Sequence, residues 1–70
     1  MNAPVECRSE HTYPQRPVAL YWGGERYPVI AIERQWRDPQ GPAFRVRTAG
    51  EQSFDLIYLE AVDEWRIEPA

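Results

Sequence analysis

The residues best suited to bind another molecule are arginines and a tryptophan in the middle of the chain. Arginine donates several hydrogen bonds from a planar group, and an indole offers a flat surface for stacking. A surface that combines the two can hold single-stranded nucleic acid through phosphate contacts and base stacking. If the strands that carry them are neighbours, one exposed patch would contain Arg34, Trp36, Arg37, Arg45 and Arg47.

These residues also have an ordinary structural explanation. Arg45 and Arg47 can pair across strands with Asp55 and Glu51, while Trp36 covers an edge of the core. The net charge is −3, whereas nucleic-acid binders are usually strongly basic. From residue 49 onward six carboxylates face one arginine. We therefore expect a protein partner first, with nucleic acid as the alternative.

Groups that could perform catalysis are few. His11 is the only histidine and Cys7 the only cysteine, and a zinc site needs at least a third protein ligand. Glu60, Asp63 and Glu64 form a carboxylate cluster, where a metal-assisted hydrolase is the only enzymatic alternative, but the spacing of a calcium loop is absent. We expect no catalytic residue, no metal site and no cofactor.

Length and composition indicate one small domain with an aromatic core. The 70 residues include three Trp, four Tyr and two Phe, which supply most of the bulk that such a core needs. A single cysteine allows no intramolecular disulfide, so nothing requires an oxidising compartment. No targeting signal and no apolar run of membrane-spanning length is present. We expect a cytoplasmic protein that does not bind membranes.

The chain divides into an arm and a β domain. Residues 1–16 contain two prolines and no hydrophobic period, which predicts a flexible, disordered arm, and residues 17–70 form the domain. Alternating apolar residues stop at Gly23-Gly24, which is typical of a two-residue hairpin turn. That turn places Trp22 opposite Glu25, and Leu20 opposite Tyr27.

The strands around this hairpin are apolar on both faces. One face carries Val18, Leu20, Trp22, Tyr27, Val29 and Ala31, and the other includes Tyr21, Ile30 and Ile32. A half-exposed sheet normally shows one polar face. Either the sheet curls into a barrel, with Pro28 at a bend, or a second copy of the chain covers Tyr21, Ile30 and Ile32 in a homodimer.

The C-terminal half predicts a surface loop and three further strands. Residues 37–43 hold two prolines and a glycine, which favours the loop. Residues 44–47 and 53–59 alternate in polarity, and a three-residue turn at 48–50 would set Phe44 opposite Phe54. A four-residue connection at 60–63 would set Tyr58 opposite Trp65, although one helical turn from 58 to 64 is a rival.

The pattern resembles a group of short, uncharacterised bacterial proteins. The resemblance covers Pro17 to Ile67 and rests on the hairpin from Trp22 to Val29, on Trp36, on the strands 44–48 and 54–58, and on Trp65-Arg66-Ile67. Members of that group sometimes accompany, or are fused to, components of error-prone Y-family DNA polymerases. The resemblance implies an accessory role near DNA damage tolerance and carries over no catalytic residue.

The sequence therefore predicts an all-β protein. We expect a single antiparallel meander of four to five strands, curled into a partly open barrel of the size of an SH3 domain, after a disordered arm. The expected function is that of a non-enzymatic binding module. The alternatives are a structural homodimer and a binder of single-stranded nucleic acid.

Overall fold

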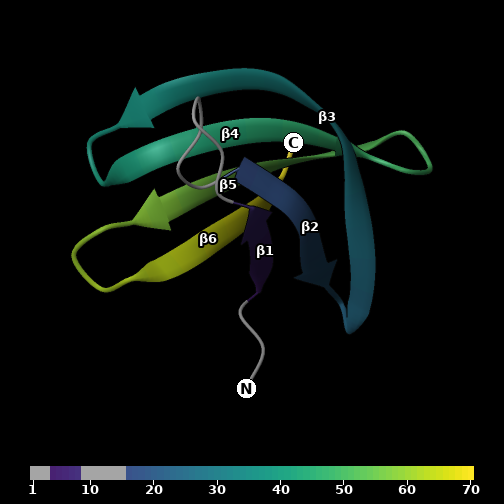
Figure 1. The fold of residues 1–70 in the computed structure, drawn as a ribbon, viewed down its shortest axis with the longest axis horizontal. Coiled ribbons are helices and arrows are strands. Elements are labelled where there is room, and N and C mark those ends of the chain that lie inside the picture. Colours follow the sequence, from purple (N-terminus) through teal and green to yellow (C-terminus); the bar gives the residue numbers. More distant parts are fainter. Residues whose placement is uncertain (1–3, 9–15) are drawn as a thin grey trace.

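The computed structural model describes residues 4–8 and 16–70, and its regular elements are all β-strands. Each strand pairs antiparallel with the next in the chain, so that one sheet runs from β1 to β6 in order (Figure 1). The strands are β1 (Val5–Arg8), β2 (Arg16–Trp22), β3 (Glu25–Asp38), β4 (Gly41–Thr48), β5 (Gln52–Leu59) and β6 (Glu64–Pro69). The all-β meander predicted from the sequence is confirmed.

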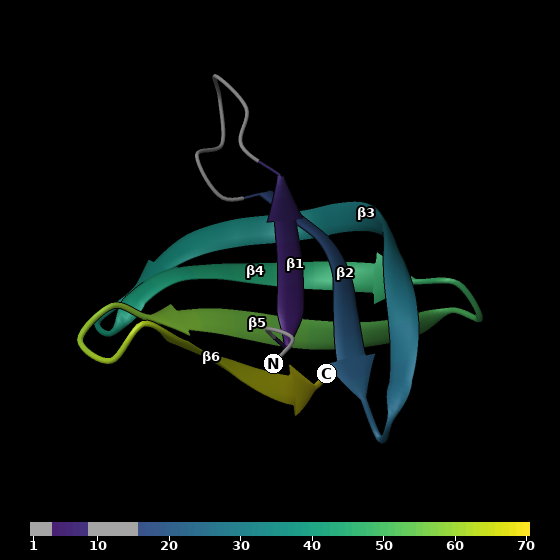
Figure 2. The ribbon, with the colours of Figure 1, turned by 60° about the horizontal axis from the view of Figure 1, so that its bottom comes forward.

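The strand β3 is long enough to belong to both halves of the sheet. Its first residues pair with β2 and its later residues pair with β4. The register with β4 shifts twice, between Val29 and Ala31 and again between Ile32 and Arg34. Such irregularities bend a strand and increase its twist. The sheet therefore folds over itself, and β1 and β2 run across β4 and β5 in Figure 2.

The core lies between the two halves of this curled sheet. One half contributes Val5 from β1 and Leu20 from β2, which are 3% and 0% exposed. The other half contributes buried side chains of β4 and β5, namely Phe44, Val46, Phe54 and Leu56. No pairing joins β1 to β6 among the described residues, so the sheet is an open half-barrel. This agrees with the partly open barrel expected from the alternation of apolar residues.

The expected strand count of four to five is wrong, because β1 adds a strand within the segment assigned to a disordered arm. Val5 pairs with Leu20, and the backbone N–H of Tyr21 donates to the carbonyl of Pro4 at 2.8 Å. Four residues are too few to show a hydrophobic period. β1 and its partner β2 are also too far apart in the sequence for a two- or three-residue turn signal to indicate their pairing. Residues 1–3 and 9–15 of the arm lie outside the described part of the chain.

Two hairpin registers are confirmed. Trp22 pairs with Glu25 across the Gly23-Gly24 turn. Tyr58 pairs with Trp65 across residues 60–63. These residues form a hairpin turn, so the rival prediction of one helical turn from 58 to 64 is wrong. In both hairpins the turn residues and the alternation of the flanking strands specify the same pairing.

The register between β4 and β5 differs from the prediction by two residues. Phe44 lies opposite Leu56, not Phe54, because β4 continues to Thr48 and the turn occupies residues 49–51. Thr48 is fully buried, and its hydroxyl donates to the carbonyl of Gln52 at 3.2 Å. That hydrogen bond makes a hydroxyl acceptable on the core face.

The surface loop expected at residues 37–43 is also shorter than predicted. β3 runs to Asp38 and β4 begins at Gly41, which leaves a two-residue turn. The side chain of Asp38 accepts a hydrogen bond from the N–H of Gln40 at 3.0 Å and so stabilises this turn. Within residues 4–8 and 16–70 no helix is long and apolar enough to cross a membrane.

Substitution of Val5 by alanine tests whether β1 belongs to the core. The loss of two buried methyl groups should lower the free energy of unfolding by about 2 kcal/mol, measured by urea denaturation. Val62 is 59% exposed, so that Val62→Ala is the matched control and should cost less than about 0.5 kcal/mol. Equal, small effects of both substitutions would show that β1 is not docked.

Substitution of Gly41 by alanine tests the close approach of β4 to β5. A Cβ there would lie 2.0 Å from the carbonyl oxygen of Tyr58, and the residue has φ +153°. We expect Gly41→Ala to destabilise the fold by roughly 2–4 kcal/mol. Gly23 has φ +60° but no neighbouring atom, so Gly23→Ala should cost about 1 kcal/mol. Both variants are measured by thermal and urea unfolding. If Gly41→Ala and Gly23→Ala lose the same amount of stability, β4 does not approach β5 closely at Gly41.

Candidate interaction surface

The strand register brings most of the predicted binding residues onto one surface. Side chains of β4 and β5 alternate between the core and the opposite side of the sheet, which we call the outer face. Two rows of residues cross this face from β3 to β6. The first row is Arg34, Arg45, Asp55 and Glu68, and the second is Trp36, Ala43, Ile57 and Arg66.

Arg34 differs from the other arginines of the outer face. Its guanidinium lies over the ring of Trp36, 5.1 Å from the centroid, which is a cation–π contact. It forms no ion pair with a carboxylate in the described part of the chain. Its neighbour across the strands is Arg45, so two positive charges lie opposite each other. Such a pair is unfavourable unless each cation has another partner.

Arg45 has that partner in Asp55. The Nε of Arg45 donates to one carboxylate oxygen at 2.8 Å, and Nη2 donates to the other at 3.0 Å. These two hydrogen bonds raise the pKa of Arg45 above its ordinary value. The pairing of Arg45 with Asp55 predicted from the sequence is confirmed, and it neutralises the centre of the outer face.

Two further arginines of this face also have carboxylates nearby. Arg47 lies 3.9 Å from Glu33, not beside Glu51 as predicted, because the register places Ser53 opposite Arg47. Arg66 lies 3.0 Å from Glu68. Arg66 was not among the binding residues predicted from the sequence, although the confirmed pairing of Tyr58 with Trp65 places Arg66 opposite Ile57.

Arg37 does not join this surface. It follows Trp36 directly in an extended strand, so its side chain points to the opposite face of the sheet. Its guanidinium forms two hydrogen bonds with Glu60, at 2.6 and 3.3 Å. Four of the five residues predicted to form one patch therefore share the outer face. The fifth ties the end of β3 to the turn after β5.

Part of the outer face is apolar. Ala43 is fully buried and Ile57 is 3% exposed, although both point away from the main core. They are flanked in their row by Trp36, which is half-buried, and by the long side chain of Arg66. The indole of Trp36 therefore lies beside a small apolar area formed by Ala43 and Ile57. The charged row of Arg34 and Arg45 lies next to this area.

The three residues predicted to form a dimer face do not share one surface. Ile32 lies opposite Val46 and packs against the core, because the register shift after Val29 reverses the alternation of β3. Tyr21 is half-buried and donates a hydrogen bond through its hydroxyl. Ile30 is 58% exposed at the irregularity itself.

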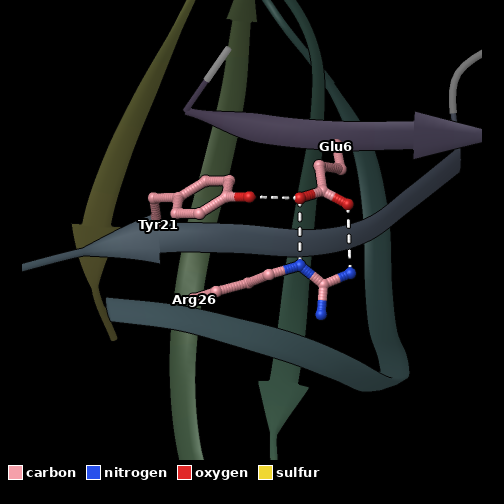
Figure 3. Close-up of polar contacts among 3 residues, drawn as sticks. All are labelled: Glu6, Tyr21 and Arg26. Atoms are coloured by element: carbon pink, nitrogen blue, oxygen red, sulfur yellow. Dashed lines mark hydrogen bonds and ion pairs between the residues drawn. The ribbon is translucent and has the colours of Figure 1, made fainter. Parts of the chain in front are cut away.

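A second cluster of polar groups fastens β1 to the sheet. Glu6 of β1 accepts a hydrogen bond from the hydroxyl of Tyr21 in β2 at 2.5 Å (Figure 3). Arg26 of β3 donates to both oxygens of the same carboxylate, each at 3.0 Å. One side chain from each of three adjacent strands thus meets at one carboxylate. This cluster was not predicted from the sequence, because β1 gives no detectable signal there.

The cluster shifts the pKa of its members in opposite directions. Hydrogen bonds from Arg26 and then Tyr21 stabilise the charged carboxylate and lower the pKa of Glu6 from 4.5 to about 2. The bond to Glu6 raises the pKa of Tyr21, because ionisation would remove its donated proton. Glu6 therefore stays negative at physiological pH, which suits a structural contact.

The other groups considered for chemistry are separated or already paired. Glu60 binds Arg37, and Asp63 accepts a hydrogen bond from the hydroxyl of Tyr58. No group of three or more His, Cys, Asp or Glu side chains is arranged to hold a metal ion within the described ranges. Cys7 is exposed on β1, and His11 lies outside the described residues.

Comparisons with protein-family models, with curated proteins and with solved structures find no match to this chain. The geometry of the chain itself therefore carries the functional argument.

The Glu6 cluster predicts a defined dependence of stability on pH. The folded-state pKa of Glu6 lies below its ordinary value, so the stability that it confers is present above about pH 4.5 and is lost as the pH falls toward 2. Glu6→Gln should be less stable than wild type at neutral pH, and this difference should shrink in acid. Urea midpoints measured across this range test the prediction.

Because the cluster is partly exposed, high salt should also narrow the difference between wild type and Glu6→Gln at neutral pH. A difference that stays constant from neutral pH to pH 2 would show that Glu6 is not bound by Arg26 and Tyr21.

Proposed function

We propose that the protein is a non-catalytic binding module that docks a partner protein on its outer face, through Trp36 and Arg34. The observation that carries the proposal is the unequal pairing of the arginines on this face. Arg45, Arg47 and Arg66 each lie near a carboxylate, whereas Arg34 forms no ion pair within residues 4–8 and 16–70 and lies over an indole.

The charge pattern of the outer face favours a protein over a nucleic acid. The arginines share this face with Glu33, Asp55 and Glu68, so it presents both signs of charge. A nucleic-acid backbone would meet these carboxylates as well as the arginines, which weakens its binding. A protein segment with one carboxylate beside an apolar side chain would match both Arg34 and Trp36.

The residue types support the same choice. Tryptophan and arginine are the side chains most enriched among those that dominate the energy of protein interfaces. Trp36 is half-buried, so that it is held in place before binding and loses little conformational freedom on contact. Arg34 in the same contact supplies the charge that selects an acidic partner.

The resemblance of residues 17–67 to companions of Y-family polymerases suggests where to look for that partner. We propose an accessory role in DNA damage tolerance, so components of an error-prone Y-family polymerase are the first purified partners to test. A homodimer, the other protein-level expectation, would rest on Ile30 alone among the three residues first assigned to it.

Substitutions at Arg34 and Trp36 test the docking surface. Arg34→Glu and Trp36→Ala should each weaken the binding of a purified partner by about 30-fold or more in calorimetry, which is the size expected for a central interface residue. Arg8→Glu makes the same charge change on β1, far along the sheet order from the outer face, and should leave affinity unchanged. Equal losses in all three variants would contradict the proposal.

The nucleic-acid alternative has its own measurement. Wild-type protein should show no micromolar binding to a fluorescently labelled single-stranded oligonucleotide in anisotropy titrations. Tight binding that falls steeply with salt, and that is lost in the double variant Arg45→Glu with Arg47→Glu, would replace the proposed protein partner by nucleic acid.

A further inference from the structure

A second surface feature lies away from the outer face, at one end of the half-barrel. A shallow pocket forms where the end of β2, the turn after β4 and the end of β6 meet, and its lining includes Trp22, Glu51, Phe54 and Pro69. In Figure 2 the end of β2 and the C-terminus lie close together on this side of the molecule. This pocket has no role in the proposed docking through Trp36 and Arg34.

The aromatic part of the pocket is rigidly supported and open to solvent. Trp22 is 41% exposed, which makes it one of the most exposed large apolar side chains of the fold. Its ring lies 5.8 Å from that of Phe54, and Phe54 lies 5.8 Å from Tyr27. Phe54 itself is 4% exposed and belongs to the core cluster. The indole is thus a solvent-accessible ring that the core holds in position.

The charge beside this indole is negative. Glu51 lines the pocket, and Glu25 lies opposite Trp22 in the hairpin. Neither carboxylate forms an ion pair with a cation in the described part of the chain, whereas Glu6, Glu60 and Asp55 each have an arginine.

An exposed aromatic ring with carboxylates beside it is the arrangement that recognises organic cations. The ring attracts a cation through its quadrupole, and the carboxylate adds a charged hydrogen bond. We infer that this pocket binds an organic cation, of the kind that an arginine or lysine side chain of a partner presents. The guanidinium suits the site best, because it can stack on Trp22 while it donates to Glu51.

A titration with a matched pair of ligands tests the inference on the full chain. N-acetyl-arginine amide and N-acetyl-citrulline amide have nearly the same shape, but only the first carries a charge. The arginine amide should shift the indole N–H signal of Trp22 in nitrogen-15 spectra, with saturation in the millimolar range expected for one weak contact. The citrulline amide should shift it little. The Trp22→Phe spectrum assigns the signal.

Variants separate the two parts of the site. Glu51→Gln should weaken binding of the arginine amide about two- to fivefold, the size of an exposed charge interaction. Trp22→Leu should weaken it by a similar factor, read from the signals of neighbouring backbone amides. Glu64 is an exposed carboxylate at the start of β6, opposite Leu59 at the end of β5 that is remote from the pocket, so Glu64→Gln should leave the affinity unchanged.

Three results would overturn the inference. Equal shifts with both amides would show that the charge is not recognised, and the absence of any shift at millimolar arginine amide would show that the pocket binds no cation. An unchanged affinity in Glu51→Gln, a variant that leaves the aromatic contacts intact, would place the cation elsewhere. Tetramethylammonium is an independent second probe of the same pocket, and it should compete with the arginine amide for binding.

Discussion

The bend of β3 is the constraint on which the rest of the structure depends. This one strand pairs with β2 at its start and with β4 from Val29 onward, and its two register shifts fall in the first part of the pairing with β4, between Val29 and Arg34. Without them β1 and β2 would continue the surface of β4 and β5, and Leu20 could not face Leu56 across a shared core. The bulges convert one flat sheet, which a chain of 70 residues cannot cover with a second layer, into two halves that cover each other.

This folding leaves two outer surfaces in water, and both are organised by arginine and carboxylate pairs. Glu6 and Arg26 tie β1 to the first half of the sheet, and Arg45 and Asp55 join the strands of the second half. Partly exposed pairs of this kind contribute modestly to stability, and they also favour one choice of neighbouring strands. Arg34 lies outside this scheme, and so do the carboxylates beside Trp22. Groups that the fold does not use are the ones most free to serve recognition.

The sequence predicted the features that depend on neighbours in the chain. The turns at Gly23-Gly24 and at residues 60–63 have the registers expected from the sequence, because turn type and alternation agree there.

The prediction failed where contacts between residues distant in the sequence determine the structure. Val5 is held by Leu20 fifteen residues away, and the core position of Ile32 follows from a bulge that shows no signal in the alternation. Of the five predicted site residues, four lie together on the outer face. Arg37 does not, because β3 continues through the position where a loop was expected.

The bend of β3 closes one core between the two halves of the sheet, and nuclear Overhauser contacts measured on methyl-labelled protein can detect that core. We expect contacts from the methyl groups of Val5 and Leu20 to side-chain protons of the β4 and β5 members of the core cluster, Phe44, Val46, Phe54 and Leu56. Contacts confined to pairs within each half, with none between Val5 or Leu20 and the residues of β4 and β5, would contradict it.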